Sequence, residues 1–220
     1  MFLSGQKKEQ IGYYKEMIKT IGSLSRLFSE SNEPYIQYRI AENLFCKSFE
    51  AKNLSRTDCS ADASKGTLGI GIKTFLDKNG ATMQKVAEFN SEHRLFNHLS
   101  PEQKILKVSE LRNKRIETTK RIFGLDNMVY HCVTRKEGAV LVYETPMDLV
   151  HIEKIHKIED RGNSINFSDG KNEYSFNITK STLYKRFYTR NLAFNLPVKI
   201  LDDPFEALEK MLSEVRASVK

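Results

Sequence analysis

One stretch of the chain combines residue types that could hydrolyse a phosphodiester bond with the help of a divalent metal ion. Two spaced acids, Asp58 and Asp62, precede a Lys-Gly turn, and the apolar run that follows ends in Lys73. This chemistry needs carboxylates to hold the ion, and commonly a lysine that orients the attacking water and stabilises developing charge. We therefore expect Asp62 to hold the ion, Asp58 to assist it, and Lys73 to position the water.

The pattern around these residues predicts a β-hairpin, because the Lys-Gly turn separates short segments and the second segment is rich in strand-forming residues. Asp62 and Lys73 are 11 positions apart, a spacing that a hairpin can bring together across its two strands. A lysine that closes a buried apolar run needs either solvent or an acidic partner. Asp62 and Asp58 are the nearest candidates for that partner.

The rest of the chain predicts a mixture of helices and strands, from apolar residues that recur at helical spacing and from short β-rich runs separated by glycine turns. We predict helices at residues 7–30, 35–51, 81–99, 101–123 and 204–219, one hairpin from 128–133 and 139–143, another from 165–167 and 174–178, a short helical or turn segment at 180–187, and a strand at 198–201. This mixture predicts an α/β fold.

The composition indicates a folded, basic protein. The 220 residues include 35 lysines and arginines against 28 acids, which gives a net charge of +7 and favours a polyanionic partner. The three cysteines lack the spacing of a zinc site or of a disulfide framework, which fits a reducing compartment. We find no apolar run long enough for a signal peptide or a membrane span, so we expect a cytoplasmic protein with no membrane contact.

The segment from Asp62 to the Gly-Ile-Gly-Ile-Lys73 strand resembles the PD-(D/E)xK nuclease superfamily, with Gly71 where the second acid usually stands. In one branch of type II restriction endonucleases, the helix after the lysine strand supplies the missing acid. Glu88 lies at the position where the resemblance places this acid, and Gln84 is the alternative candidate for the same role. A glutamate on the preceding helix joins the metal ligands in other members, a role that Glu42 or Glu50 matches, and we prefer Glu42.

The resemblance implies an α/β fold of the restriction-endonuclease-like kind, a central mixed β-sheet flanked by α-helices. It implies a single nuclease domain over residues 1–220, with a helical part at 1–55, a catalytic core at 56–125 and a β-rich part at 126–220. The activity it implies is that of a Mg²⁺-dependent, sequence-specific type II restriction enzyme that cleaves double-stranded DNA as a homodimer within a restriction system. The catalytic residues would be Asp62, Lys73 and Glu88, and the metal ligands Asp62, Glu88, Glu42 and Asp58.

Candidate DNA contacts form two groups. Arg56 stands beside the predicted metal site, where it could clamp a phosphate. The second group is a later cluster in which basic and hydroxyl residues alternate with aromatic ones: Lys180, Ser181, Thr182, Lys185, Arg186 and Arg190. We interpret the basic run at 112–115, with 120–121, as a solvated helix face.

Two other functions and one purely structural interpretation stay open. The chain could be a non-catalytic DNA-binding or regulatory module, which the glycine at position 71 favours. It could also be a nuclease that acts on RNA or branched DNA. In the structural interpretation, Asp62 caps the start of a strand and Lys73 is a solvated strand end.

Overall fold

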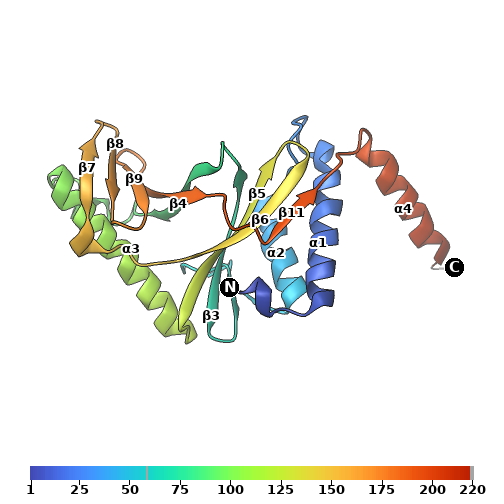
Figure 1. Ribbon diagram of the computed structural model, residues 1–220, viewed down its shortest axis with the longest axis horizontal. Coiled ribbons are helices and arrows are strands. Elements are labelled where there is room, and N and C mark those ends of the chain that lie inside the picture. Colours follow the sequence, from blue (N-terminus) through green and yellow to red (C-terminus); the bar gives the residue numbers. More distant parts are fainter. Residues whose placement is uncertain (58, 219–220) are drawn as a thin grey trace.

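The structure is a computed structural model that describes residues 1–57 and 59–218, with side chains up to residue 214. Asp58, which we expected to assist the metal ion, lies outside the described residues. The fold is mixed α/β, as predicted, with two β-sheets and four α-helices (Figure 1). The helices are α1 (Lys8–Ser23), α2 (Tyr38–Phe49), α3 (Pro101–Phe123) and α4 (Pro204–Ser218), and short 3-10 turns span Leu3–Gly5, Ser25–Leu27, His93–Leu95 and Ile152–Lys154.

The first sheet has six strands in the order β1-β2-β3-β5-β6-β11. Its strands are β1 (Lys52–Asn53), β2 (Ala63–Lys65), β3 (Leu68–Leu76), β5 (Asn127–Lys136), β6 (Ala139–Pro146) and β11 (Phe194–Pro197). β3 and β5 run parallel and the other neighbours antiparallel, so the sheet is mixed. β2 and β3 form the predicted hairpin, with Gly66 at its turn in the left-handed region, where glycine is favoured (φ +57°).

The second sheet has five antiparallel strands in the order β4-β10-β9-β8-β7. They are β4 (Ala81–Glu88), β7 (His156–Asp160), β8 (Ser164–Ser168), β9 (Glu173–Asn177) and β10 (Thr182–Tyr188). β4 pairs along its length with β10, about a hundred residues later in the chain. Strand β4 is therefore held in this sheet by β10, which comes near the end of the chain.

Helices α1 and α2 cover one face of the first sheet (Figure 1). Ile70 and Ile72 of β3 belong to the core cluster that Tyr14 of α1 and Phe45 of α2 share with this face. Because successive side chains of a strand point to opposite faces, Gly71 and Lys73 face the other way. The hairpin thus holds its apolar residues against the two helices and turns its lysine away from them.

Helix α3 packs against the second sheet and begins and ends as the sequence predicts. A capping box joins Ser100 and Gln103 at its start, Pro101 is its first residue, and Gly124 ends it in the left-handed region (φ +62°). Ile105 and Val108 on its inner side share a core with strands of the second sheet. The later part of α3 lies against the hairpin region of the first sheet.

Three predicted elements are wrong. Residues 81–99 form β4 and a 3-10 turn instead of a helix, because pairing with β10 overrides a helical spacing of apolar residues. The segment at 180–187 is mostly strand β10, and the strand expected at 198–201 lies at Phe194–Pro197. The other predicted helices and both later hairpins are confirmed with ends shifted by at most three residues, except that the helix predicted at 7–30 ends at Ser23 and is followed by a 3-10 turn.

Within the described residues, no helix has the length and apolar character needed to cross a membrane.

Candidate active site

Asp62 and Lys73 line the same cavity, as the hairpin prediction requires. Asp62 lies directly before β2, and its backbone N–H donates to the carbonyl of Ile70 on β3 (2.8 Å). Lys73 lies further along β3, on the face turned away from α1 and α2, with its Nζ 5.9 Å from the centre of the Tyr130 ring. Local strand pairing therefore places a carboxylate and an ammonium at one pocket.

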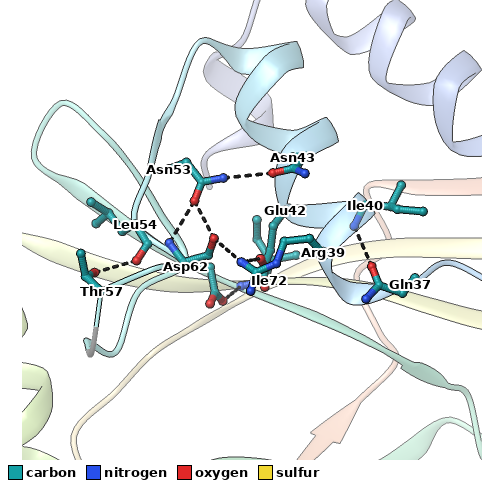
Figure 2. Close-up of polar contacts among 11 residues, drawn as sticks. Gln37, Arg39, Ile40, Glu42, Asn43, Asn53, Leu54, Thr57, Asp62 and Ile72 are labelled. Atoms are coloured by element: carbon teal, nitrogen blue, oxygen red, sulfur yellow. Dashed lines mark hydrogen bonds and ion pairs between the residues drawn. The ribbon is translucent and has the colours of Figure 1, made fainter.

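Asp62 is held rigidly by backbone groups on both sides. Its Oδ2 accepts the N–H of Ile72 at 2.7 Å, and its carbonyl accepts the N–H of Leu54 at 2.8 Å (Figure 2). The second carboxylate oxygen, Oδ1, makes no hydrogen bond within the described residues. It is the oxygen that remains for a ligand.

Glu42 on α2 joins Asp62 from the side of the helix (Figure 2). Glu42 is 5% exposed, although glutamate is rarely buried without a partner. Its partner is Arg39, one turn earlier, whose Nη1 lies 2.8 Å from Glu42 Oε2 and also donates to Ser55 Oγ at 2.5 Å. Arg39 thus ties α2 to the loop that leads into β2 and fixes the Glu42 carboxylate.

The pKa values of both carboxyl groups are raised. Burial raises the pKa of Glu42, and the negative charge of Asp62 raises it further, against the opposing effects of Arg39 and Lys73. Burial also raises the pKa of Asp62, although the Ile72 N–H and Lys73 oppose the shift. A bound cation would relieve this unfavourable concentration of negative charge.

The cavity has a volume of about 550 Å³, and helix α3 forms its opposite wall. Four cations line it, Lys73, Arg112, Lys114 and Arg115, together with the two acids Asp62 and Glu92. Excess positive charge around a small acidic corner is the pattern expected where a phosphate backbone is bound next to a metal ion.

Arg112 is the most deeply buried of these cations, at 2% exposure. Its Nη1 donates to the carbonyl of Asp148 at 2.7 Å and its Nη2 to the hydroxyl of Tyr130 at 3.4 Å, while its Nε has no partner. Among the described residues, no carboxylate pairs with it. Its charge is therefore available to an anion in the cavity.

Gly71, which stands where the resemblance would place a second acid, faces the same side as Lys73 but has no room for a side chain. A Cβ at this position would lie 2.6 Å from Met147 Cε and 3.2 Å from Tyr130 Cδ1. Met147 and Tyr130 therefore fill the space that an acid would occupy. The glycine is a consequence of this packing.

The structure does not support the predicted role of Glu88. It lies on strand β4 instead of a helix, it is exposed, and its Oε2 pairs with Lys85 Nζ at 2.9 Å. Glu88 and its competitor Gln84 are both absent from the cavity lining, as is Glu42, but Glu42 is buried and lies near Asp62. Glu50, the alternative to Glu42, is the exposed residue that ends α2.

The predicted DNA-binding cluster is only partly at the surface. Ser181 and Thr182 are 2% and 3% exposed, and the Thr182 hydroxyl donates to the Lys180 carbonyl at 2.7 Å. Contrary to our expectation, neither side chain faces solvent. Lys185 is also buried, because it occupies an inward position of β10. The remaining members, Lys180, Arg186 and Arg190, are exposed or half-buried, as is Arg56.

Sequence reasoning missed the contribution of α3 and of Glu92. We interpreted the basic run at 112–115 as a solvated face, but Arg112, Lys114 and Arg115 line the cavity. Glu92 accepts from Arg115 Nη2 at 2.6 Å; burial acts to raise the pKa of Glu92, but this hydrogen bond and the one from Ser91 lower it overall. The available signal was the close grouping of three basic residues at positions 112, 114 and 115 of the helix.

The site offers few carboxylates for a metal ion. Among residues 1–57 and 59–218, no group of three or more His, Cys, Asp or Glu side chains is arranged around a metal position. Mg²⁺ in phosphoryl-transfer sites is commonly held by one or two carboxylates together with substrate phosphates and water. Asp62, in the cavity lining, and Glu42, which lies outside that lining but close enough to be influenced by the charge of Asp62, could supply such a pair of carboxylates.

No family model, curated protein or solved structure matches this chain.

Proposed function

We propose that this protein is a Mg²⁺-dependent endonuclease that hydrolyses phosphodiester bonds of double-stranded DNA, with a restriction-endonuclease-like arrangement of its first sheet. The observation that carries the proposal is that Asp62 and Lys73 line one cavity whose opposite wall is basic. The order of helix α2 with Glu42, then Asp62, then Lys73 at the end of a buried run is the order that the resemblance to PD-(D/E)xK nucleases implies.

In this proposal, each side chain in or beside the cavity has a separate task. Arg112, Lys114 and Arg115 hold the phosphates of the substrate from the side of α3. Lys73 orients the attacking water and stabilises the negative charge that develops on the phosphate. Asp62 and Glu42 would hold Mg²⁺, which supplies charge neutralisation and a more acidic water when bound. Arg39 keeps Glu42 in position through its contact at 2.8 Å.

The experiment is incubation of supercoiled plasmid with the purified protein, with Mg²⁺ and then with EDTA. We expect nicked, linear or fragmented DNA with Mg²⁺ and intact plasmid with EDTA. The Asp62→Asn variant, prepared in the same way, controls for contaminating nuclease, because Asn keeps the acceptor for the Ile72 N–H but loses the charge. Cleavage by this variant at the rate of the wild type would overturn the assignment.

A non-catalytic DNA-binding or regulatory module is the second candidate, and a specific observation favours it. The space of the second acid is filled by Met147 and Tyr130, so the cavity has fewer carboxylates than the resemblance implies. In the plasmid experiment, this candidate predicts DNA that is shifted on a gel and intact with or without Mg²⁺. Parallel incubations with RNA and with branched DNA test whether the substrate is another nucleic acid.

The proposal includes a homodimer, because cleavage of both strands at a symmetric duplex site calls for two copies related by a twofold axis. Sedimentation equilibrium, with and without DNA, measures the oligomeric state. A monomer on its DNA would restrict the proposal to nicking or to asymmetric sites, and would remove the restriction-system role from it.

A further inference from the structure

A second charged pocket lies beside strand β10 and the end of β6, and shares no residue with the candidate active-site cavity. Its volume is about 300 Å³, which is at the lower end of the range for small-molecule sites. Four cations line it: Lys171, Lys185, Arg186 and Arg190. We refer to this region as the β10 pocket.

Lys185 is the unusual residue of the β10 pocket. It is 3% exposed, and among the described residues it forms no ion pair and no side-chain hydrogen bond. Its Nζ lies 5.6 Å from the centre of the Tyr130 ring and 5.5 Å from that of Phe187, so aromatic faces provide part of its stabilisation. Burial of an ammonium group without an anion is costly.

The other groups at the pocket leave positive charge and donors in excess. Lys171 pairs with Asp148 at 2.8 Å and Arg186 with Glu173 at 2.7 Å, but no carboxylate pairs with Arg190 among the described residues. The amide nitrogen Nδ2 of Asn172 is buried and has no hydrogen-bond partner.

Glu144, the acid in the lining, is already engaged. Its two carboxylate oxygens accept the N–H of Leu3 at 3.2 and 3.3 Å, and Oε1 also lies 3.5 Å from Nδ1 of the buried His131. It is therefore not the counter-ion of Lys185. The pocket keeps two cations and one amide donor without acceptors.

We propose that the β10 pocket binds a phosphomonoester, such as the phosphate of a nucleotide. Phosphate oxygens can accept from an ammonium, an amide and a guanidinium at the same time, and two negative charges match Lys185 and Arg190. The aromatic ring of Tyr188, which is 40% exposed, lines the same pocket and offers apolar surface for the organic part of such a molecule. This inference does not depend on the proposed cleavage reaction.

The electrostatics of Lys185 agree with a site that is completed by an anion. Burial and the nearby Arg112 lower the pKa of Lys185 to about 8, while Asp148, Cys132 and Asp169 act in the opposite direction. A bound phosphate would favour the ammonium form. At a pH above the pKa of Lys185 in the ligand-free protein, phosphate binding should therefore be accompanied by uptake of a proton.

Isothermal titration calorimetry with inorganic phosphate and with AMP tests the site, on wild type, Lys185→Met and the control Lys210→Met, an exposed lysine on α4. We expect binding to wild type and to the control, and at least tenfold weaker binding to Lys185→Met. Titration in two buffers of different ionisation enthalpy, about one unit above the pKa of Lys185, should show proton uptake in wild type and in the control but not in Lys185→Met.

Thermal unfolding separates a ligand site from a purely structural lysine. If Lys185 serves a ligand, Lys185→Met without phosphate should melt above wild type, because methionine fills the space without a buried charge, and phosphate should raise the melting temperature of wild type only. If Lys185 acts only through the aromatic rings, the variant should melt below wild type. Arg190→Gln, an exposed residue, provides a second variant should Lys185→Met fail to fold, and should also weaken phosphate binding.

Oligonucleotides distinguish the two sources of a phosphomonoester. Tighter binding of a 5′-phosphorylated strand than of the same strand with a 5′-hydroxyl, lost in Lys185→Met, would identify the ligand as a strand end. Binding of AMP without this difference would identify a free nucleotide. Equal affinity of wild type and Lys185→Met for every probe, or no binding by wild type at millimolar concentration, would overturn the proposal.

Discussion

The candidate active-site cavity and the β10 pocket are both basic, but they balance their charges differently. In the cavity, Asp62, directly before β2, and Lys73 on β3 bring opposite charges to one place. In the β10 pocket, the buried Lys185 has no counter-ion among the described residues. The cavity is therefore arranged for a ligand with both a cation and phosphates, whereas the β10 pocket needs only an anion. This difference can be tested one residue at a time.

The largest effect is expected for Lys73→Met. Methionine keeps the apolar part of the side chain over Tyr130 but removes the charge that faces the cavity. Loss of one preorganised group that stabilises developing charge typically lowers kcat about 10²–10³-fold. Single-turnover cleavage of a plasmid measures this, with Lys78→Met, an exposed lysine after β3, as the control. Cleavage by Lys73→Met at the control's rate would remove the functional difference between the two pockets.

A smaller effect, on stability, is expected for Gly71→Ala. The added Cβ would meet Met147 Cε, which can shift, and the Tyr130 ring, which is fixed in the core. Overpacking of this kind costs about 1–3 kcal/mol, and we expect the lower end because a methionine methyl is mobile. Urea denaturation of Gly71→Ala, Met147→Ala and the double variant gives the coupling energy between the two sites.

That double-mutant cycle sharpens the account of why the cavity lacks a further acid. If packing against Met147 excludes a side chain at position 71, the double variant should be more stable than the sum of the two single changes implies. Additive losses would mean that Met147 does not restrict position 71. The glycine would then need another explanation.

The candidate site was predictable where its residues are close in the chain. The spacing of Asp62 and Lys73 and the glycine turn between them specify a hairpin, and strand pairing alone places both side chains at one cavity. Helix α3 was predictable for a similar reason, since Ser100, Pro101 and Gly124 mark its ends locally. Glu42 was identified from the resemblance, and its burial is consistent with that choice.

The parts that sequence reasoning missed depend on contacts between distant segments. Met83, Val86, Phe89 and Phe96 have a spacing that suits a helix, but β4 is fixed by β10, and one strand alone does not reveal its partner. For the same reason Lys185, Ser181 and Thr182 looked like a surface cluster although they face inward. The basic residues of α3 line the cavity only because the second sheet sets the position of that helix.

A change confined to a pH window is expected for Asp62→Asn. Because burial raises the pKa of Asp62, the folded protein keeps this proton at pH values where the unfolded chain has lost it. The stability that Asp62 contributes is present below the ordinary aspartate range and is lost as the pH rises through the raised pKa. Wild type and variant should therefore unfold alike at about pH 3, and the variant should be the more stable at neutral pH.

Denaturant unfolding at both pH values, with Asp126→Asn as an exposed control, measures this difference. The effect is modest because Asp62 is only half-buried and solvent screens part of its charge. Mg²⁺ should recover stability in wild type at neutral pH and leave Asp62→Asn unchanged, since a ligand stabilises only the state that binds it. An equal response of both proteins to Mg²⁺ would place the ion elsewhere.

The smallest effect is expected for Glu88→Gln, and it decides between two acids. Glu88 is exposed on β4, pairs with Lys85 at 2.9 Å and does not line the cavity, so its replacement should change the free energy of unfolding by no more than about 0.5 kcal/mol. Cleavage should continue at the wild-type rate, whereas Glu42→Gln should require a higher Mg²⁺ concentration, because it removes one of the two carboxylates proposed to hold the ion. Inactive Glu88→Gln beside active Glu42→Gln would assign the second metal-binding carboxylate to β4, and would require β4 to move toward Lys73 when DNA binds.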